Sequence, residues 1–272
     1  TALAPHYANC VPVPVDCQKY MNINPLLIEE KITDKTVAIV VTHVYGRICD
    51  MEPILGVCKK YDLDLFEDCC EVHGALYHDG PRKGETVGSL GVGCFSFFRN
   101  KIIQGQEGGA VCIADDLPYA AHLRDLKNMS FGEEHNYIHE HIGFNYRMPD
   151  AQAIMILKSL KKARLNFSLR NRVAAIYDES LMEALVRPSR AASWVYDINH
   201  RNPKELVKYL NGLGVPARRT FAPMSMQPCF GVKDNYNTLV SYELYNNTCY
   251  LPVTPSMTSQ EVKHICKMVH EF

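Results

Sequence analysis

A lysine and an aspartate are candidate catalytic residues because each lies at the end of a stretch that is predicted to be a buried strand. Lys101 closes the run Cys94 to Lys101, and Asp68 closes the run Leu63 to Asp68. A lysine amine can form a Schiff base with an aldehyde, and a strand-end carboxylate can keep a pyridine nitrogen protonated. Pyridoxal phosphate chemistry needs both groups, because the protonated ring then acts as an electron sink.

The surroundings of Lys101 fit the same chemistry. Ser96 lies shortly before it, and a glycine-rich stretch, Gly105 to Gly109, follows it. Small residues let the backbone approach a ligand closely, and a hydroxyl can bind a phosphate. The alternative is an ordinary loop in which Lys101 is solvated, the glycines make a turn, and Ser96 is buried and bonded to the backbone.

Asp68 would be costly to bury without a partner. A protonated pyridine nitrogen could be that partner, and so could a helix N-terminus or an ion pair. Glu71 and His73 could stack on or bond to the ring, or could serve local structure. Arg147, just before a long helical stretch, could bind a carboxylate or phosphate with both guanidinium nitrogens, or could belong to a helix-capping turn.

These residues must be positioned by alternating strands and helices. The β-branched run Thr36 to His43 predicts a buried strand, and the apolar spacing of Asp50 to Tyr61 predicts a helix. This order predicts an α/β fold with a mostly parallel sheet, whose functional residues cluster beyond the carboxyl ends of the strands. Further predicted strands are Leu63 to Phe66, Cys94 to Phe98 and Ala110 to Ala114.

The rest of the chain predicts a second, smaller unit. Pro149-Asp150 opens one long helix that runs to about Met182. The segments after it alternate between strand and helix patterns, which predicts a small α+β domain. We expect a large domain at 1–183 and a small domain at 184–272. The expected later elements are strands at Ser193 to Ile198 and Thr248 to Leu251, and helices at Pro203 to Leu213 and Ser259 to Val269.

Composition excludes several classes of protein. The 272 residues carry a formal net charge of −1, which argues against a nucleic-acid binder. No apolar run reaches the roughly 18 residues of a membrane helix, and we see no signal peptide at Thr1. The eleven cysteines are scattered through apolar segments without paired zinc spacing, so we expect reduced thiols in a cytoplasmic protein and no structural metal.

An ordered series of motifs over nearly the whole chain resembles the DegT/DnrJ/StrS family of nucleotide-sugar aminotransferases, which have the type I aminotransferase fold. Chance agreement of so many motifs in order is negligible. The motifs are Pro12 to Asp16, Thr42 to Gly46, Glu67 to Gly74, Val87 to Gly91, Cys94 to Lys101, Gln106 to Gly109, Asn145 to Met148, Ser193-Trp194, and Arg218 to Pro228.

The resemblance implies a role for each matching residue. Lys101 would be the Schiff-base lysine, Asp68 the partner of the pyridine nitrogen, and Glu71 a partner of the ring's phenolic oxygen. Ser96 would bind the cofactor phosphate. Asn145 would reach the phosphate of the neighbouring subunit's cofactor, because the family's sites lie at a homodimer interface. Arg147 and Arg218 are candidate substrate-binding residues.

The resemblance implies that the chain would use pyridoxal 5'-phosphate and glutamate to aminate a nucleotide-linked keto sugar of the kind used in polysaccharide biosynthesis. Lys101 argues against a deoxygenating branch that has histidine there, and Glu71 points to the perosamine-type enzymes that aminate C4 of a 4-keto-6-deoxy sugar. A truncated, non-catalytic or regulatory relative is the alternative, and a lyase or dehydratase is a third.

The chain departs from the family pattern in three places. Family members normally begin well before the segment that matches Thr1, in a part that carries a phosphate-binding turn. We therefore expect a fragment, a truncated product or one piece of a longer protein. Gln106 replaces a glycine, and Ser225 stands where perosamine-type members often have histidine.

Overall fold

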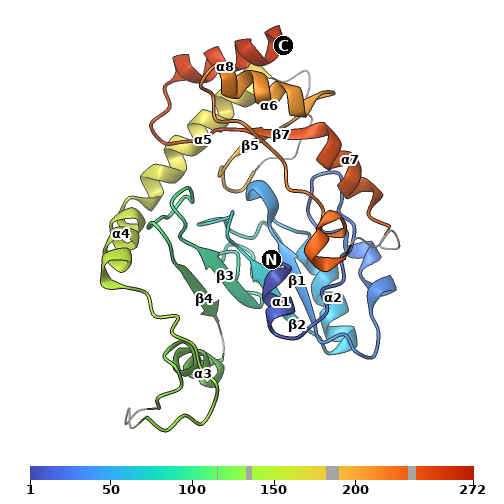
Figure 1. The fold of residues 1–272 in the computed structure, drawn as a ribbon, viewed down its shortest axis with the longest axis vertical. Helices are drawn as coiled ribbons and strands as arrows, with labels where there is room; N and C mark the ends of the chain where they lie inside the picture. Colours follow the sequence, from blue (N-terminus) through green and yellow to red (C-terminus); the bar gives the residue numbers. More distant parts are fainter. Residues whose placement is uncertain (115, 133–136, 182–189, 232–236) are drawn as a thin grey trace.

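Two β-sheets, one above the other in Figure 1, organise the chain. The computed structural model describes residues 1–114, 116–132, 137–181, 190–231 and 237–272. The helices are α1 Leu3–Tyr7, α2 Met51–Tyr61, α3 Leu117–Lys127, α4 Asp150–Lys161, α5 Ala163–Ser180, α6 Pro203–Gly212, α7 Leu239–Asn247 and α8 Ser259–Glu271. The strands are β1 Ala38–Thr42, β2 Asp64–Asp68, β3 Val92–Ser96, β4 Gly109–Ile113, β5 Tyr196–Asn199, β6 Arg218–Arg219 and β7 Thr248–Leu251.

The first sheet has the strand order β1-β2-β3-β4. Its first three strands are parallel, and β4 runs antiparallel to β3 as an edge strand. The carboxyl ends of β1, β2 and β3 therefore share one edge, which faces the second sheet in Figure 1. In register, Thr42 pairs with Asp68, and Asp68 pairs with Cys94. The predicted α/β fold with a mostly parallel sheet is confirmed.

The core beneath this edge is built by α2 and the strands. Met51, Ile54, Val57 and Cys58 recur at helical spacing and are buried, so α2 lays one apolar face against the sheet. The helix ends at Tyr61 and is capped by Asp62, whose φ of 53° is in the left-handed region. This packing positions the start of β2, the next strand, relative to β1.

The second sheet is antiparallel, with the order β5-β7-β6. Helices α5, α6 and α8 contribute the fully buried side chains of Tyr177, Leu206, Leu210 and Val262 to one core with this sheet. A capping box begins α8, in which the Thr258 hydroxyl and the Glu261 carboxylate satisfy each other's backbone N–H groups.

The prediction of one helix from Asp150 to Met182 is wrong. Lys162, with φ −100° and ψ 4°, separates α4 from α5, and Met182 lies outside the described residues. The two helices serve different cores, because Ile156 of α4 packs near Ile103 whereas the later turns of α5 enter the core of the second sheet. No pattern in the sequence predicted α1, α3, α7 or β6.

The proposed boundary between 183 and 184 lies outside the described residues and stays a proposal. All eleven cysteines fall within the described ranges, and each is a free thiol. Among the helices described above, none has the length and apolar character that crossing a membrane requires.

Candidate active site

Asp68, the last residue of β2, carries a carboxylate at the centre of the shared strand edge. Its Oδ1 accepts a hydrogen bond from the Cys70 N–H at 3.1 Å, and its Oδ2 accepts one from the Thr1 hydroxyl. The Thr42 hydroxyl lies 3.4 Å behind that of Thr1. Burial alone would raise the pKa of Asp68, but these hydrogen bonds hold it below its ordinary value. Asp68 is therefore ionised at neutral pH.

Glu67, the residue before Asp68, links β2 to the segment after β1 and to the segment before β3. Its side chain is fully buried, and His43 Nδ1 accepts a hydrogen bond from the Cys49 N–H, so we assign the ring proton of His43 to Nε2, which donates to Glu67. This network ties the end of β2 to the turn that leads into β3. The remaining donors to the Glu67 carboxylate are the Leu90 and Gly91 N–H groups, each at 3.0 Å, and the Tyr77 hydroxyl.

Lys101 sits in the turn after β3, on a loop that folds back onto the β3–β4 hairpin. Its N–H donates to the Phe98 carbonyl at 2.9 Å, and Phe97 N–H donates to the Gly108 carbonyl at 2.8 Å. Gly108 has φ 128°, a conformation that favours glycine. The Lys101 Nζ lies 3.9 Å from the centroid of the Trp194 ring. The loop therefore turns the amine back toward the strand ends.

Glu71 is a buried carboxyl group whose pKa is affected by the charges of both Asp68 and Lys101. Its Oε2 accepts a hydrogen bond from the Tyr45 N–H at 2.7 Å. Burial raises the pKa of Glu71 to about 7, and the negative charge of Asp68 adds to that rise. The positive charge of Lys101 and the Tyr45 hydrogen bond oppose the shift. Glu71 can therefore be neutral or ionised near neutral pH.

His73 is the unexplained polar group of this region. It is 2 % exposed, and within the described part of the chain neither ring nitrogen has a hydrogen-bond partner. Burial and the positive charge of Lys101 together lower the pKa of His73 to about 4, against the opposing effect of the nearby Ser96 backbone. A neutral imidazole with two unused polar atoms fits a site that awaits a polar ligand.

Ser96 ends β3, two residues beyond the partner of Asp68, and is half-buried. Its Oγ accepts a hydrogen bond from the Phe98 N–H at 3.3 Å. The hydroxyl hydrogen has no recorded acceptor among the described residues, so it can donate to a ligand. The strand edge thus brings together the predicted residues Asp68, Glu71 and Lys101, with Ser96 at the end of the adjoining strand.

Two predicted residues are not brought to this edge. Asn145 forms an isolated β-bridge with Asn128, and Arg147 Nη1 donates to the Asn128 side-chain oxygen at 3.0 Å. Asn128 caps α3, which projects from the opposite end of the sheet in Figure 1. Asn145 and Arg147 therefore lie away from Asp68 and Lys101 of the same chain.

Arg218 and Ser225 take different positions. Arg218 pairs in register with Tyr250, whose ring centroid lies 5.6 Å from that of Tyr45, so it borders the region around Glu71. Ser225 is buried, and its hydroxyl lies 2.8 Å from that of Thr238. This hydroxyl pair gives Ser225 a structural partner.

Sequence reasoning missed three groups at the site. Thr1 and Thr42 support the Asp68 carboxylate, and Trp194 covers the Lys101 amine. Their contacts span 41 to 93 residues of sequence, and no local pattern signals them. The motif that contains Ser193-Trp194 marked the position without indicating the contact.

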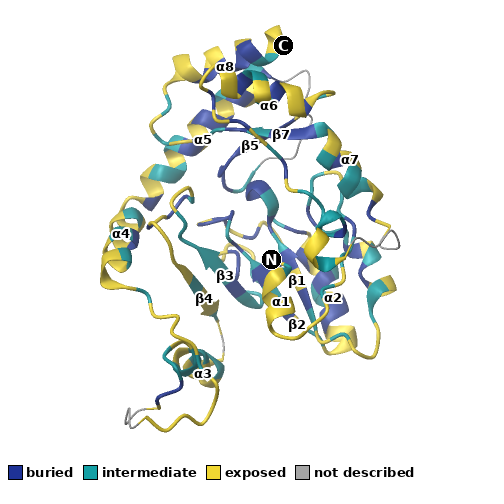
Figure 2. Cartoon of the chain, in the orientation of Figure 1, coloured by how far each residue is buried: buried dark blue, intermediate teal, exposed yellow. Residues whose placement is uncertain are grey.

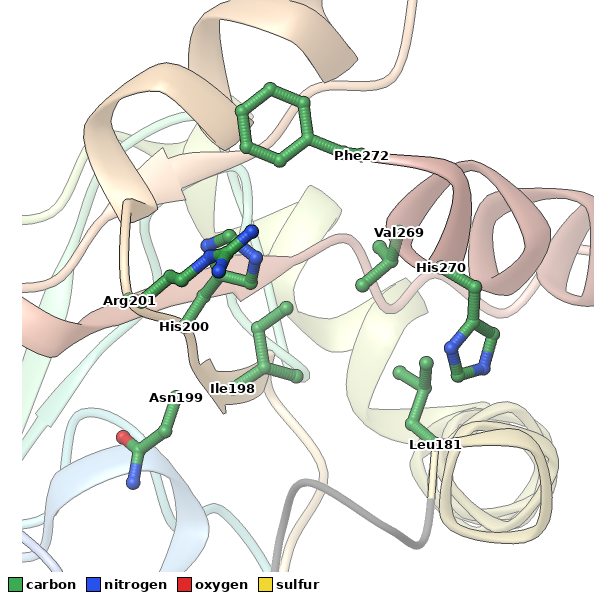
Figure 3. A pocket seen from close by; sticks show the side chains of 8 residues that line it. All are labelled: Leu181, Ile198, Asn199, His200, Arg201, Val269, His270 and Phe272. Atoms are coloured by element: carbon green, nitrogen blue, oxygen red, sulfur yellow. The ribbon is translucent and has the colours of Figure 1, made fainter.

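A cavity of about 310 Å³ lies elsewhere, at the far side of the second sheet (Figure 3). Its histidines already serve structure, because His270 Nε2 lies 2.9 Å from the Ser180 carbonyl and His200 Nδ1 accepts from the Asn202 N–H. None of the predicted site residues lines it. The chemistry-bearing residues therefore place the candidate site at the strand ends rather than in this cavity.

Comparison with known proteins gives a consistent result. The DegT/DnrJ/EryC1/StrS aminotransferase family matches residues 1–270. The chain is 34% identical over 237 residues to a GDP-perosamine synthase of Caulobacter vibrioides, and the match covers 82% of this chain and 62% of that enzyme. It is 32% identical to a GDP-perosamine synthase of Escherichia coli O157:H7, over 98% of this chain and 74% of that enzyme. The match thus spans less than two thirds of the Caulobacter relative.

Solved structures share the fold. The Helicobacter pylori aminotransferase PseC, involved in the biosynthesis of pseudoaminic acid, superposes with a TM-score of 0.91 at 23% identity. That match covers 100% of this chain and 76% of PseC. The S. venezuelae protein DesV superposes with a TM-score of 0.89 at 23% identity, over 99% of this chain and 74% of DesV.

Proposed function

Because this chain belongs to the DegT/DnrJ/EryC1/StrS aminotransferase family, we propose that it is a pyridoxal-phosphate-dependent aminotransferase that transfers the amino group of glutamate to a nucleotide-linked 4-keto-6-deoxy sugar. The observation that carries the proposal is the convergence of an ionised Asp68 and the Lys101 amine on buried Glu71 at one strand edge. The GDP-perosamine synthases among the relatives support the sugar class.

The donor set of the site fits this cofactor. Asp68 offers an ionised carboxylate for a protonated pyridine nitrogen, Ser96 a hydroxyl for a phosphate, and Lys101 an amine for an aldehyde. The unpartnered ring nitrogens of His73 add two buried polar atoms that a ligand could satisfy. When bound, pyridoxal phosphate supplies an electron sink for the carbon that bears the transferred amino group.

Each residue would then have a defined role. Asp68, which its hydrogen bonds keep ionised, would hold the proton on the pyridine nitrogen. Lys101 would hold the cofactor through its amine, and the free amine would accept and return the proton at the reacting carbon. Glu71, whose carboxylate accepts a hydrogen bond from the Tyr45 N–H, would be a partner of the phenolic oxygen. Glutamate would be the first substrate and the keto sugar the second.

Absorbance of the purified chain with added pyridoxal phosphate tests the proposal. A band at about 420 nm should appear when the cofactor becomes covalently attached to Lys101. Glutamate alone should then remove the band and release about one equivalent of 2-oxoglutarate, because the first half-reaction needs no sugar. No band, or a band that glutamate leaves unchanged, would favour a non-catalytic relative. A band lost without release of 2-oxoglutarate would rule out glutamate as the donor.

Glu71 predicts a pH-dependent stability. An acid whose pKa is raised by folding binds protons in the native state, so its burial weakens the fold as pH rises from its ordinary 4.5 toward about 7. Glu71→Gln cannot ionise but keeps an oxygen for the Tyr45 N–H. We expect the stability of the variant relative to the original chain to increase from about pH 5 to pH 8, as measured by urea unfolding without cofactor.

The matched control is Glu29→Gln. Glu29 is exposed, and the hydrogen bond from Lys60 lowers its pKa, so it is already ionised throughout this pH range. Its substitution should therefore give a stability difference that does not change with pH. A pH-independent difference for Glu71→Gln as well would show that this carboxyl does not titrate in the native state near neutral pH.

We also propose that the chain forms a homodimer. Ile154, Leu157 and Leu160 share one flank of α4 and are 54%, 51% and 52% exposed. Figure 2 shows most of α4 as exposed. An apolar stripe of this kind is typical of a protein interface. In such a dimer Asn145, which lies away from its own strand edge, would be free to reach the phosphate of the neighbouring subunit's cofactor.

Leu157→Glu tests the proposed interface. A charge in the centre of the stripe should shift the chain from dimer to monomer, because an unpaired carboxylate would be buried on association. Sedimentation velocity gives the mass of each form. Lys158→Glu, the exposed neighbouring position, should leave the dimer intact. A monomeric original chain, or a Leu157→Glu chain that stays dimeric, would place the interface elsewhere or remove it.

A further inference from the structure

The amine of Lys101 rests on the face of an aromatic ring. Its Nζ lies 3.9 Å from the centroid of the Trp194 ring. This is well within the distance at which an ammonium is attracted to the negative face of an indole, the strongest of the aromatic partners. In the described part of the chain, no carboxylate lies within ion-pair distance of Lys101. The charge of Glu71 acts on it from further away, and the indole is in direct contact with its amine.

The indole is fixed in place from several sides. Trp194 is 6 % exposed, and its Nε1–H donates to the carbonyl of Asn100, the residue before Lys101, at 2.9 Å. Its backbone carbonyl accepts a hydrogen bond from Arg170 at 3.0 Å. The Tyr45 ring lies 6.3 Å away, centroid to centroid. The same side chain thus anchors the turn that carries Lys101 and offers a face to its amine.

Trp194 also connects the reactive lysine to the second sheet. It belongs to the segment that leads into β5, and the Ala191 and Ala192 N–H groups of that segment both donate to the Gly46 carbonyl. A Cβ at Gly46 would meet the Ala192 carbonyl oxygen at 1.5 Å, so the two backbones are in close contact. The position of the indole is therefore set jointly by both parts of the chain.

We propose that Trp194 is a positioning residue that holds the free amine of Lys101 on its indole face. The role rests on the proposed function, in which Lys101 alternates between attachment to the cofactor and release during proton transfer. A fixed resting place restricts the long, flexible lysine side chain to one side of the site and returns it there in each half-reaction. The contact itself exists in the cofactor-free chain and can be tested there.

The first test measures the reactivity of the Lys101 amine without cofactor. The chain is treated with a small amine-acylating reagent, and mass spectrometry follows Lys101 relative to exposed Lys158 in the same molecules. Trp194→Leu should raise the relative rate at Lys101 about three- to tenfold, because an amine that is no longer attracted to the ring moves away from it and meets the reagent more often. Trp194→Phe, similar in size to leucine but aromatic, should raise it less than about twofold.

The pair of variants separates attraction from access. Equal acceleration in Trp194→Phe and Trp194→Leu would mean that the indole only blocks the reagent, and no acceleration in either would mean that the ring does not hold the amine. Either result would overturn the proposal. Circular dichroism of each variant confirms that the comparison is made between folded chains.

The second test leaves the indole intact. Trp194 is the single tryptophan of the chain, so its fluorescence reports on one ring. Lys101→Met removes the charge but keeps an unbranched side chain, and it should change the emission intensity and maximum of the cofactor-free chain. Lys158→Met should leave both unchanged. Identical spectra for Lys101→Met and the original chain would overturn the proposal even if the Trp194 variants fail to fold.

The two proposals can fail separately. The acylation and fluorescence experiments contain no cofactor, so a chain that gives no absorbance band with pyridoxal phosphate can still show the Lys101–Trp194 contact. Conversely, a chain that attaches cofactor and releases 2-oxoglutarate but passes neither of these tests keeps the proposed function and loses the positioning role of Trp194.

Discussion

Lys101→Ala should abolish covalent attachment of pyridoxal phosphate and reduce amino transfer from glutamate by at least about a thousandfold. Two contributions disappear with one amine: the covalent link to the cofactor and the base that moves the proton at the reacting carbon. General acid–base catalysis alone contributes roughly 10² to 10⁴ in rate. The absorbance band near about 420 nm and the release of 2-oxoglutarate measure the two contributions separately.

Lys101→Ala also has a useful rescue control. A small primary amine added to the buffer can occupy the space left by the lysine side chain and restore part of the proton transfer, but it cannot restore a link to the chain. Lys158→Ala, on the exposed face of α4, should retain the band and the activity. Full activity in Lys101→Ala would assign the chemistry to another residue and remove the basis of the proposed site.

The sequence predicted the parts of the fold in which local pattern and tertiary packing agree. The β-branched run before His43 and the apolar spacing of Met51 to Cys58 each match a face that is buried in the structure, so β1 and α2 follow directly. The long helix was wrong because apolar periodicity continues through Lys162 while the two halves pack into different cores. Periodicity records which residues are apolar and not which core receives them.

The candidate site was predictable only where the sheet topology determines the position of a residue. Asp68 and Lys101 both follow strands of a parallel sheet, and topology alone places such residues at one edge. The support of Asp68 by Thr1, the raised pKa of Glu71 and the contact of Lys101 with Trp194 depend on side chains far apart in sequence. Each is a consequence of burial and close approach, which exist only once the two parts of the chain have packed together.

The same dependence on packing leads to the largest stability effect that we expect. Asp197 of β5 is fully buried. Its carboxylate accepts hydrogen bonds from both terminal nitrogens of the Arg47 guanidinium, at 2.8 and 3.2 Å, and from Arg190 Nη2 at 2.9 Å. Burial lowers the pKa of each arginine to about 10, so both stay charged at neutral pH. One carboxylate therefore neutralises two buried cations, one of which comes from the turn after β1.

Asp197→Ala should lower the free energy of unfolding by about 3 to 5 kcal/mol, because it leaves Arg47 buried without a counter-ion and leaves Arg190 with only its longer contact to Asp178. Arg47→Met should cost less, since Asp197 keeps Arg190 and the methionine stem fills much of the space. Asp178→Asn provides the comparison on the surface: Asp178 is 62% exposed and 3.8 Å from Arg190, and its loss should cost less than about 1 kcal/mol. Urea unfolding measures all three.

The order of these losses is more informative than any one of them. If Asp197 is the centre of the cluster, its removal must be worse than the removal of either cation, because only Asp197 contacts both guanidinium groups at hydrogen-bond distance. Asp197 also lies three residues after Trp194, so partial loosening of β5 should weaken the hold on the Lys101 amine before the fold is lost. Similar losses for Asp197→Ala and Arg47→Met would show that water reaches the cluster, and its role in joining the two sheets would have to be abandoned.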